Sequence, residues 1–158
     1  MELIIEKLTE EYAKQLCEWK YDAEYSVYNF APWDIAVQQK WSITDPKDRE
    51  SNFRSVTNKQ GELVGFFRIT KDTDEKIEIG LGMSPEYCGI GIGKDFVKII
   101  TQHVKADYPN CLIYMEVREF NIRAVKCYEN CGYKVILKHY LDFPWGSGDY
   151  YHMEYINE

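Results

Sequence analysis

An alternating apolar pattern that leads into a run of glycines constrains the fold of this chain more than any other feature. In the segment Ile77–Met83 every second residue is apolar, and Glu78, Gly80 and Gly82 lie between them. A period of two residues is typical of a strand with one apolar face. Pro85 follows and is expected to end the strand, because proline cannot donate a hydrogen bond to a neighbouring strand.

Glycines at every second position follow this strand and precede an expected helix. Gly89, Gly91 and Gly93 allow backbone conformations that other residues avoid, and they leave the main-chain amides open to a ligand. The helix expected from Lys94 adds the unpaired N–H groups and the positive dipole end of its first turn. The dipole disfavours Lys94 at that position unless an anion is bound. The junction therefore predicts a site for a phosphate-bearing cofactor.

Two better-known glycine patterns do not fit this segment. An NTPase phosphate loop has four residues between its first glycine and the Gly-Lys pair, followed by Ser or Thr. Here three residues separate Gly89 from Gly93, and Asp95 follows Lys94. The dinucleotide fingerprint GxGxxG requires its third glycine one residue later. A flexible turn without a ligand is the structural alternative, because glycine patterns alone are weak evidence.

A helix, a strand and a second, shorter helix are expected next. Apolar residues at helical spacing predict the helix Lys94–Lys105, and Leu112–Val117 has the character of a strand. Asn121 is a good N-cap for a helix that starts at Ile122, and Gly132 suits the left-handed position that ends it. The second helix is therefore expected to be about ten residues long.

Together these two segments resemble the acetyl-CoA-binding core of the GNAT acetyltransferase superfamily. The glycine segment looks like the family's cofactor loop, (Gln or Arg)-x-x-Gly-x-(Gly or Ala), although Cys88 takes its polar first position. The short helix looks like the family's N-x-x-A-x-x-x-Y-x-x-x-G-(F or Y) segment. The residues that match it are Asn121, Ala124, Tyr128, Gly132 and Tyr133. The resemblance covers roughly residues 64 to 136, and the order of elements fits the whole chain.

The resemblance implies the GNAT fold, an α/β arrangement with a mixed, mostly antiparallel, twisted sheet of about six to seven strands and about four helices. The central strands Ile77–Met83 and Leu112–Val117 are expected to splay apart. Acetyl-CoA is the implied cosubstrate, with its pantetheine arm beside the first of these strands and its pyrophosphate on the loop amides. The cofactor-binding residues implied are Leu81, Met83, Cys88, Gly89, Ile90, Gly91, Ile92, Gly93, Lys94, Asn121 and Tyr128. For Asn121, the capping role is a sufficient structural explanation.

Acetyl transfer to an amine needs a neutral nucleophile, a stabilised oxyanion and a proton for the departing thiolate. By the resemblance Tyr128 supplies that proton, since a phenol with a pKa of about 10 stays protonated at neutral pH. Glu78 ranks first as the base for the amine, because it shares a strand face with Gly80 and Gly82. Glu116 and a chain of water molecules are the alternatives. A core tyrosine and an exposed strand glutamate are the structural interpretations of Tyr128 and Glu78.

An aromatic segment in the first third of the chain is the expected acceptor pocket. Tyr25, Tyr28 and Trp33 offer flat surfaces to an amine-bearing substrate, and acidic residues lie beside them in the sequence. An aromatic mini-core under a loop is the structural alternative. Elements expected around this segment are a strand over Leu3–Glu6, a helix capped by Thr9, and a hairpin of Phe53–Thr57 with Leu63–Ile69.

Two further strands are expected at the carboxyl end, Lys134–Leu141 and Tyr150–Tyr155, separated by the turn residues Pro144–Gly148. They either wall the same pocket or form the edge of a homodimer. The sequence does not decide between these two roles.

The length and composition of the whole chain limit the classes of protein to which it can belong. At 158 residues it suits a single domain, residues 1–158. Its apolar runs are too short to cross a bilayer and its N-terminus lacks the apolar stretch of a signal peptide, so a cytoplasmic protein without a membrane partner is expected.

The formal net charge of −7 argues against nonspecific nucleic-acid binding, which needs excess Lys and Arg. It suits a cationic amine substrate, and solubility explains it equally well.

The cysteines predict neither a disulfide framework nor a metal site. The chain has five of them, an odd number without a CxxC pattern. Cys127 and Cys131 share a helical face and could ligate a metal, but buried thiols are the commoner arrangement. No metal is therefore expected.

The sequence thus predicts an N-acetyltransferase that moves an acetyl group from acetyl-CoA to a primary amine of a small molecule or peptide by direct attack. A catalytically silent acyl-CoA-binding or sensor module is the alternative from another class. An NAD-type oxidoreductase is a third hypothesis, and it predicts nicotinamide binding.

Overall fold

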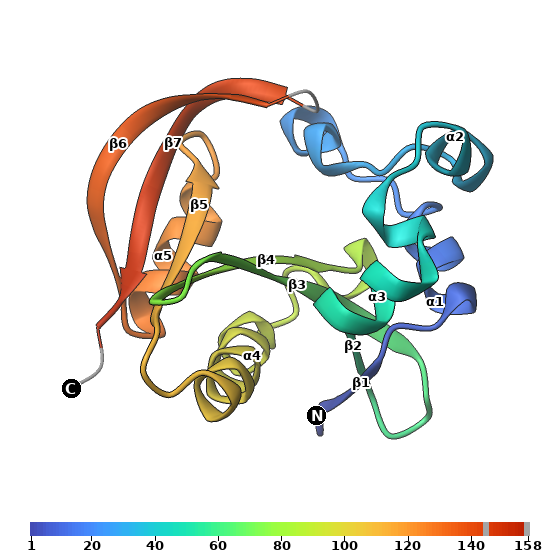
Figure 1. Cartoon of the computed structure of the whole chain (residues 1–158), viewed down its shortest axis with the longest axis horizontal. Helices are drawn as coiled ribbons and strands as arrows, with labels where there is room; N and C mark the ends of the chain where they lie inside the picture. Colours follow the sequence, from blue (N-terminus) through green and yellow to red (C-terminus); the bar gives the residue numbers. More distant parts are fainter. Residues whose placement is uncertain (144–145, 157–158) are drawn as a thin grey trace. The chain divides into compact units, whose positions relative to one another are not determined.

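A computed structural model of the chain describes residues 1–143 and 146–156. Its strands are β1 (Ile4–Lys7), β2 (Phe53–Thr57), β3 (Leu63–Thr73), β4 (Lys76–Met83), β5 (Leu112–Arg118), β6 (Tyr133–Phe143) and β7 (Gly146–Tyr155). The α-helices are α1 (Glu10–Leu16), α2 (Trp33–Gln38), α3 (Pro46–Asn52), α4 (Gly93–Asp107) and α5 (Ile122–Asn130). Short 3₁₀ helices are η1 (Ala23–Tyr28), η2 (Ser42–Thr44) and η3 (Pro85–Tyr87). Figure 1 shows these elements along the chain.

The strands form a seven-stranded sheet in the order β1-β2-β3-β4-β5-β7-β6. β1 with β2, β2 with β3, β5 with β7 and β6 with β7 pair antiparallel, whereas β4 and β5 pair parallel. The expected mixed, mostly antiparallel α/β sheet is therefore confirmed. The described residues form five α-helices, where the resemblance implied about four. Of these five, α2 and α3 were not predicted from the residues.

The chain divides into two compact units. Met1–Arg68 with Leu81–Ile90 make the first unit, and Ile69–Gly80 with the chain from Gly91 onward make the second. β3 and β4 therefore contribute residues to both. That the chain behaves as a single domain stays a prediction.

The first unit is built around a hydrophobic core beneath its short helices. Thr9 caps α1 as expected, because its side chain accepts a hydrogen bond from the Tyr12 amide at 3.1 Å. Asp45 caps α3 in the same way, at 2.9 Å from the Asp48 amide, with Pro46 at the first helical position. The buried core residues are Leu8, Ala13, Leu16, Ile43, Phe53, Leu63 and Phe66.

The second unit packs two helices and a long strand pair. The apolar face of α4 that the sequence predicts is buried, with Phe96, Val97, Ile100 and Val104 each at most 2% exposed. β6 and β7 are the two long orange-red strands of Figure 1. They pair side by side from Tyr133 and Tyr155 at one end to Phe143 and Gly146 at the other. The expected turn over residues 144–148 falls partly outside the described residues, because 144 and 145 are not described.

The two central strands pair over a short length only. The parallel register joins Lys76 to Leu112 and ends with Glu78 opposite Tyr114, although β4 and β5 both continue. This short register is the local feature expected of splayed strands. Beyond Glu78, the next β4 residues are Ile79, which is 2% exposed, and the exposed Gly80.

Among residues 1–143 and 146–156, none of the helices combines the length and apolar character that a bilayer-spanning helix requires.

Candidate functional site

The glycine loop has the backbone geometry that the sequence predicts. Gly89 and Gly91 adopt φ values of +77° and +89°, which L side chains rarely reach. Apart from the glycine itself and its two chain neighbours, no described atom lies within 4 Å of a Cβ built on either residue, so the space there is open. The loop leads into α4 at Gly93, and Ile92 provides no side-chain cap for it among the described residues. The first amides of α4 therefore depend on some partner other than a capping side chain.

α5 packs against the start of α4. A Cβ on Gly93 would lie 3.5 Å from Cys127 Sγ, and Cys131 Sγ donates to the Lys94 carbonyl at 3.6 Å. Burial raises the pKa of Cys131 to about 11, so this thiol is neutral at physiological pH. Both thiols therefore lie where α5 meets the first residues of α4.

Asn121 and Tyr128 lie at the two ends of α5. Asn121 Oδ1 accepts a hydrogen bond from the Ala124 amide at 3.2 Å, so the predicted capping role is confirmed. Gly132, with φ of +98°, follows the last residues of the helix as predicted. Tyr128 is half-buried, and its ring centroid lies 6.2 Å from that of Tyr133. The Tyr133 hydroxyl is itself hydrogen-bonded to Thr101, at 2.7 Å.

The backbone at the end of β4 has side-chain contacts that the sequence did not predict. The Met83 carbonyl accepts a hydrogen bond from the Tyr21 hydroxyl at 2.5 Å, and Cys88 Sγ lies 3.8 Å from the same oxygen. Gly82 is required by packing, since a Cβ there would lie 2.6 Å from the Phe66 ring. A pantetheine arm beside Leu81 and Met83 stays a prediction, and the Met83 carbonyl already has a protein donor.

The aromatic residues expected to bind the acceptor lie in the first unit. Tyr25 and Tyr28 are on η1 and half-buried, and the ring of Tyr28 meets that of Tyr21 edge-on at 6.4 Å. Trp33 begins α2, packs against the hydrophobic core and carries Lys14 Nζ at 5.7 Å from its ring centroid. This packing corresponds to the aromatic mini-core named as the alternative, and substrate binding by these residues stays a prediction.

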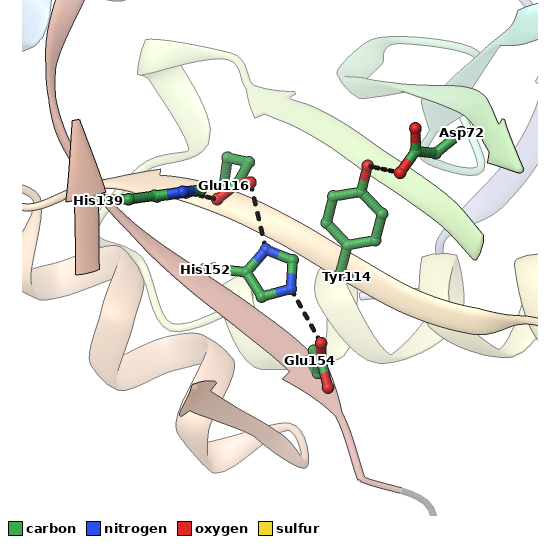
Figure 2. A network of polar contacts seen from close by, with 6 residues as sticks. All are labelled: Asp72, Tyr114, Glu116, His139, His152 and Glu154. Carbon is green, nitrogen blue, oxygen red and sulfur yellow. Dashed lines mark hydrogen bonds and ion pairs between the residues drawn. The ribbon is translucent and has the colours of Figure 1, made fainter. Parts of the chain in front are cut away.

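A cluster of histidines and carboxylates, which no pattern in the sequence analysis identified, lies on β5, β6 and β7 (Figure 2). His139 Nε2 lies 2.8 Å from Glu116 Oε1, and His152 Nδ1 lies 3.2 Å from Glu116 Oε2. His152 Nε2 lies 2.9 Å from Glu154 Oε2. Glu116, His139, His152 and Glu154 are called the His–Glu cluster below.

The neighbouring residues add further negative charge. The Tyr114 hydroxyl donates to Asp72 Oδ2 at 3.1 Å, and its ring stacks on His152 with centroids 4.9 Å apart. Burial, then the charges of Glu78 and the other nearby carboxylates, raises the pKa of Tyr114, so its hydroxyl stays protonated at neutral pH. Glu78, the first-ranked base, lies opposite Tyr114 in the strand register.

The His–Glu cluster borders a cavity of about 310 Å³. Its lining residues are Asp72, Lys76, Tyr114, Glu116, Ile136, Leu137, His139, His152 and Glu154. Burial alone would lower the pKa of His152, but hydrogen bonds with Glu154 and Glu116 outweigh it, so the pKa of this imidazole is raised.

Sequence reasoning identified Glu116 as a second candidate base and missed His139, His152 and Glu154. The strand pair expected near residues 134–155 was the available signal, because alternate residues of a strand share a face. The bulge between Val135 and Leu137 shifts the register and could not be read from the sequence.

The Acetyltransferase (GNAT) family profile matches residues 13–133. The chain therefore belongs to the acetyltransferase (GNAT) family. This membership confirms the resemblance stated from the two motifs.

Two curated relatives of the chain are named as spermine or spermine/spermidine acetyltransferases. The spermine/spermidine N(1)-acetyltransferase of Bacillus subtilis (strain 168) is 30% identical over 83 residues, 48% of this chain and 55% of the relative. A curated relative from Bacillus subtilis subsp. natto matches to the same extent. The match spans about half the length of these curated relatives, 55%.

Solved structures resemble the whole chain in fold. A chimera of the spermidine N-acetyltransferase SpeG from Vibrio cholerae and hSSAT has a TM-score of 0.78 at 16% identity, over 99% of this chain and 96% of that one. The Vibrio cholerae spermidine N-acetyltransferase in complex with CoA and spermine has a TM-score of 0.65 at 15% identity, over 96% and 94%. At these identities the likeness concerns the fold.

Proposed function

We propose that the chain is an acetyl-CoA-dependent N-acetyltransferase that acetylates a primary amine of a polycationic small molecule such as a polyamine. The observation that carries the proposal is the loop of residues 88–94. Its two left-handed glycines and the uncapped start of α4 present main-chain N–H groups, which are the donors that a diphosphate requires. Acetyl-CoA, when bound, supplies the activated acetyl thioester.

Tyr128 is the proposed proton donor for the departing thiolate. It lies on α5, the helix whose Cys127 contacts the position of Gly93 at the start of α4. A phenol keeps its proton at neutral pH and so is ready to protonate a thiolate.

For the base, the His–Glu cluster favours Glu116 over the first-ranked Glu78. The side chain of Glu116 is only 12% exposed, and both its oxygens face imidazole nitrogens. A general base must pass on the proton that it takes, and the hydrogen-bonded route through His152 to Glu154 gives it a path. Glu78 lies opposite Tyr114 in the register of β4 and β5, and it stays the second candidate for the base.

The charge of the cavity supports a polycationic acceptor. Asp72, Glu116 and Glu154 line it, and Lys76 is the one lysine among its lining residues. An ammonium group is attracted to such a carboxylate-rich surface, more strongly where water is partly excluded. The curated relatives named as spermine/spermidine acetyltransferases support the same acceptor class.

The proposal is tested by incubating the chain with acetyl-CoA and a panel of amines, reading free thiol. The panel contains spermine, spermidine, putrescine, free lysine and an aminoglycoside. We expect turnover with the polyamines above that with free lysine. Acetyl-CoA binding in calorimetry without thiol release from any amine would favour the catalytically silent module, and no acetyl-CoA binding would exclude both hypotheses.

Tyr128→Phe separates binding from chemistry. The substitution removes the hydroxyl alone, so we expect kcat to fall by about 10²-fold while the Kd for acetyl-CoA changes little. Tyr133→Phe is the matched control, because it removes a buried hydroxyl that bonds to Thr101, and it should lower stability by about 1 kcal/mol without lowering kcat. Equal turnover of Tyr128→Phe and the unmodified chain would remove the proton-donor role.

A further inference from the structure

We propose that Glu116, His139 and His152 form a binding site for a divalent transition metal of the kind that imidazole prefers, with Zn²⁺ as the representative ion. No metal was expected from the sequence, where only the thiols of α5 were considered. The proposal concerns metal binding by the free chain, without acetyl-CoA or an amine, because an ion bound to Glu116 and His152 would occupy the groups proposed to take and relay the proton of the amine.

The three ligands come from three neighbouring strands and share one face of the sheet. Glu116 on β5 lies opposite His152 on β7, and His139 on β6 lies opposite Tyr150, two residues from His152. Ligands held on paired strands are positioned more precisely than ligands on loops. The site is therefore largely formed before an ion arrives.

The distances are close to those of a first coordination shell. One ligand atom from each residue can be chosen so that all lie within 4.8 Å of one another. Tetrahedral Zn²⁺ with bonds of about 2.0–2.1 Å holds its ligand atoms about 3.3 Å apart. Rotation of the side chains closes this difference, since Glu116 already contacts both rings at 2.8 Å and 3.2 Å.

An outer carboxylate supports one of the ligands. His152 Nε2 lies 2.9 Å from Glu154 Oε2, while its Nδ1 faces Glu116 (Figure 2). A metal-binding histidine usually donates its other N–H group to a carboxylate, which fixes the tautomer and the ring orientation. Glu154 is therefore the positioning residue of the site. The side chains of His152, Glu116 and Glu154 are only 13%, 12% and 20% exposed, so the arrangement is sheltered from water.

The cavity and its charge are suited to an ion. About 310 Å³ lies beside the three ligands, enough for a water or substrate atom in a fourth position. Two imidazoles and one carboxylate favour Zn²⁺, Fe²⁺, Co²⁺ or Ni²⁺, whereas Mg²⁺ and Ca²⁺ favour oxygen ligands alone. The excess of carboxylates in the lining would be offset by a divalent charge.

The test is calorimetric titration of Zn²⁺ into the full chain after removal of metals with a chelator, with Mg²⁺ as the comparison ion. We expect one Zn²⁺ per chain and no comparable binding of Mg²⁺. His139→Ala and His152→Ala should each raise the Kd for Zn²⁺ more than tenfold. His103→Ala is the matched control, since the His103 ring on α4 pairs with Asp107 at 3.7 Å, and it should bind Zn²⁺ like the unmodified chain.

Two more variants make the result decisive. Glu154→Gln should raise the Kd for Zn²⁺ by about 10- to 100-fold, the usual cost of losing an outer-shell carboxylate. Cys127→Ser removes a thiol near Cys131 and should leave the Kd unchanged. Circular dichroism confirms the fold of each variant, and His139→Ala is the safest of them because that side chain is 34% exposed. Absence of Zn²⁺ binding by the unmodified chain, an unchanged Kd for Zn²⁺ in both histidine variants, or loss of binding in Cys127→Ser would overturn the site.

Discussion

The loop that opens α4 and the His–Glu cluster on β5, β6 and β7 offer opposite chemistry to a ligand. In the loop Gly89 and Gly91 carry no side chain, and main-chain N–H groups at the start of a helix favour anions. The cluster brings two carboxylates and two imidazoles together, and carboxylates favour cations. A transferase that joins a phosphorylated cosubstrate to an ammonium-bearing acceptor needs both kinds of surface.

The two regions are held in place by different interactions. The loop is held by local backbone conformation, so a single substitution there acts through φ and ψ. The cluster is held by strand register and by hydrogen bonds between side chains that lie 23 and 36 residues apart in the chain. Substitutions in the cluster should therefore change chemistry first, and substitutions in the loop should change binding first.

The largest effect is expected from the base. Glu116→Gln keeps the size of the side chain but cannot accept a proton, so kcat for amine acetylation should fall by about 10²- to 10⁴-fold. Glu78→Gln is the matched control and should change kcat by no more than a few-fold if Glu116 is the base. Initial rates of thiol release with spermidine measure both. A larger loss in Glu78→Gln would return the base to the residue that the sequence ranked first.

The fold of the second half was predictable because its signals are local. The alternation of Ile77–Met83, the cap at Asn121 and the left-handed Gly132 each act within one turn or strand, and the structure reproduces all three. The Asp45–Pro46 pair was an equally local helix-start signal for α3, with the side chain of Asp45 accepting from the Asp48 amide. It was not used, and α3 was missed for that reason.

The His–Glu cluster was not predictable to the same degree. Glu116 was recognisable as a strand carboxylate, but its partners depend on which residue of β6 lies opposite which residue of β7. The bulge between Val135 and Leu137 changes that register after the first residues of β6. Tyr21 illustrates the same limit, because its hydroxyl reaches the Met83 carbonyl across 62 residues of sequence. Contacts of this kind follow from tertiary packing.

A smaller effect is expected in the loop. Gly91→Ala places a side chain at φ of +89°, which should cost about 1–2 kcal/mol of conformational strain and shift the amides away from the diphosphate. We expect the Kd for acetyl-CoA to rise by at least tenfold. Gly61→Ala is a close match, since Gly61 has φ of +79° and the same open space but belongs to the β2–β3 hairpin. It should lose similar stability in thermal melts and keep its acetyl-CoA affinity. Equal loss of affinity in both variants would attribute the effect to stability alone.

The smallest effect concerns Asn121, where capping and ligand contact are combined in one side chain. Asn121→Asp keeps a good N-cap, whereas Asn121→Ala should cost about 1 kcal/mol of unfolding free energy. If the amide also donates to the cosubstrate, Asn121→Asp should raise the Kd for acetyl-CoA several-fold with almost no change in stability, because a carboxylate only accepts. Thr9→Ala on α1 is the control for loss of a cap, and it should lower stability by a similar amount without changing the Kd. Unchanged acetyl-CoA binding in Asn121→Asp would leave Asn121 with the capping role alone, and the anion-binding region would then consist of main-chain groups only.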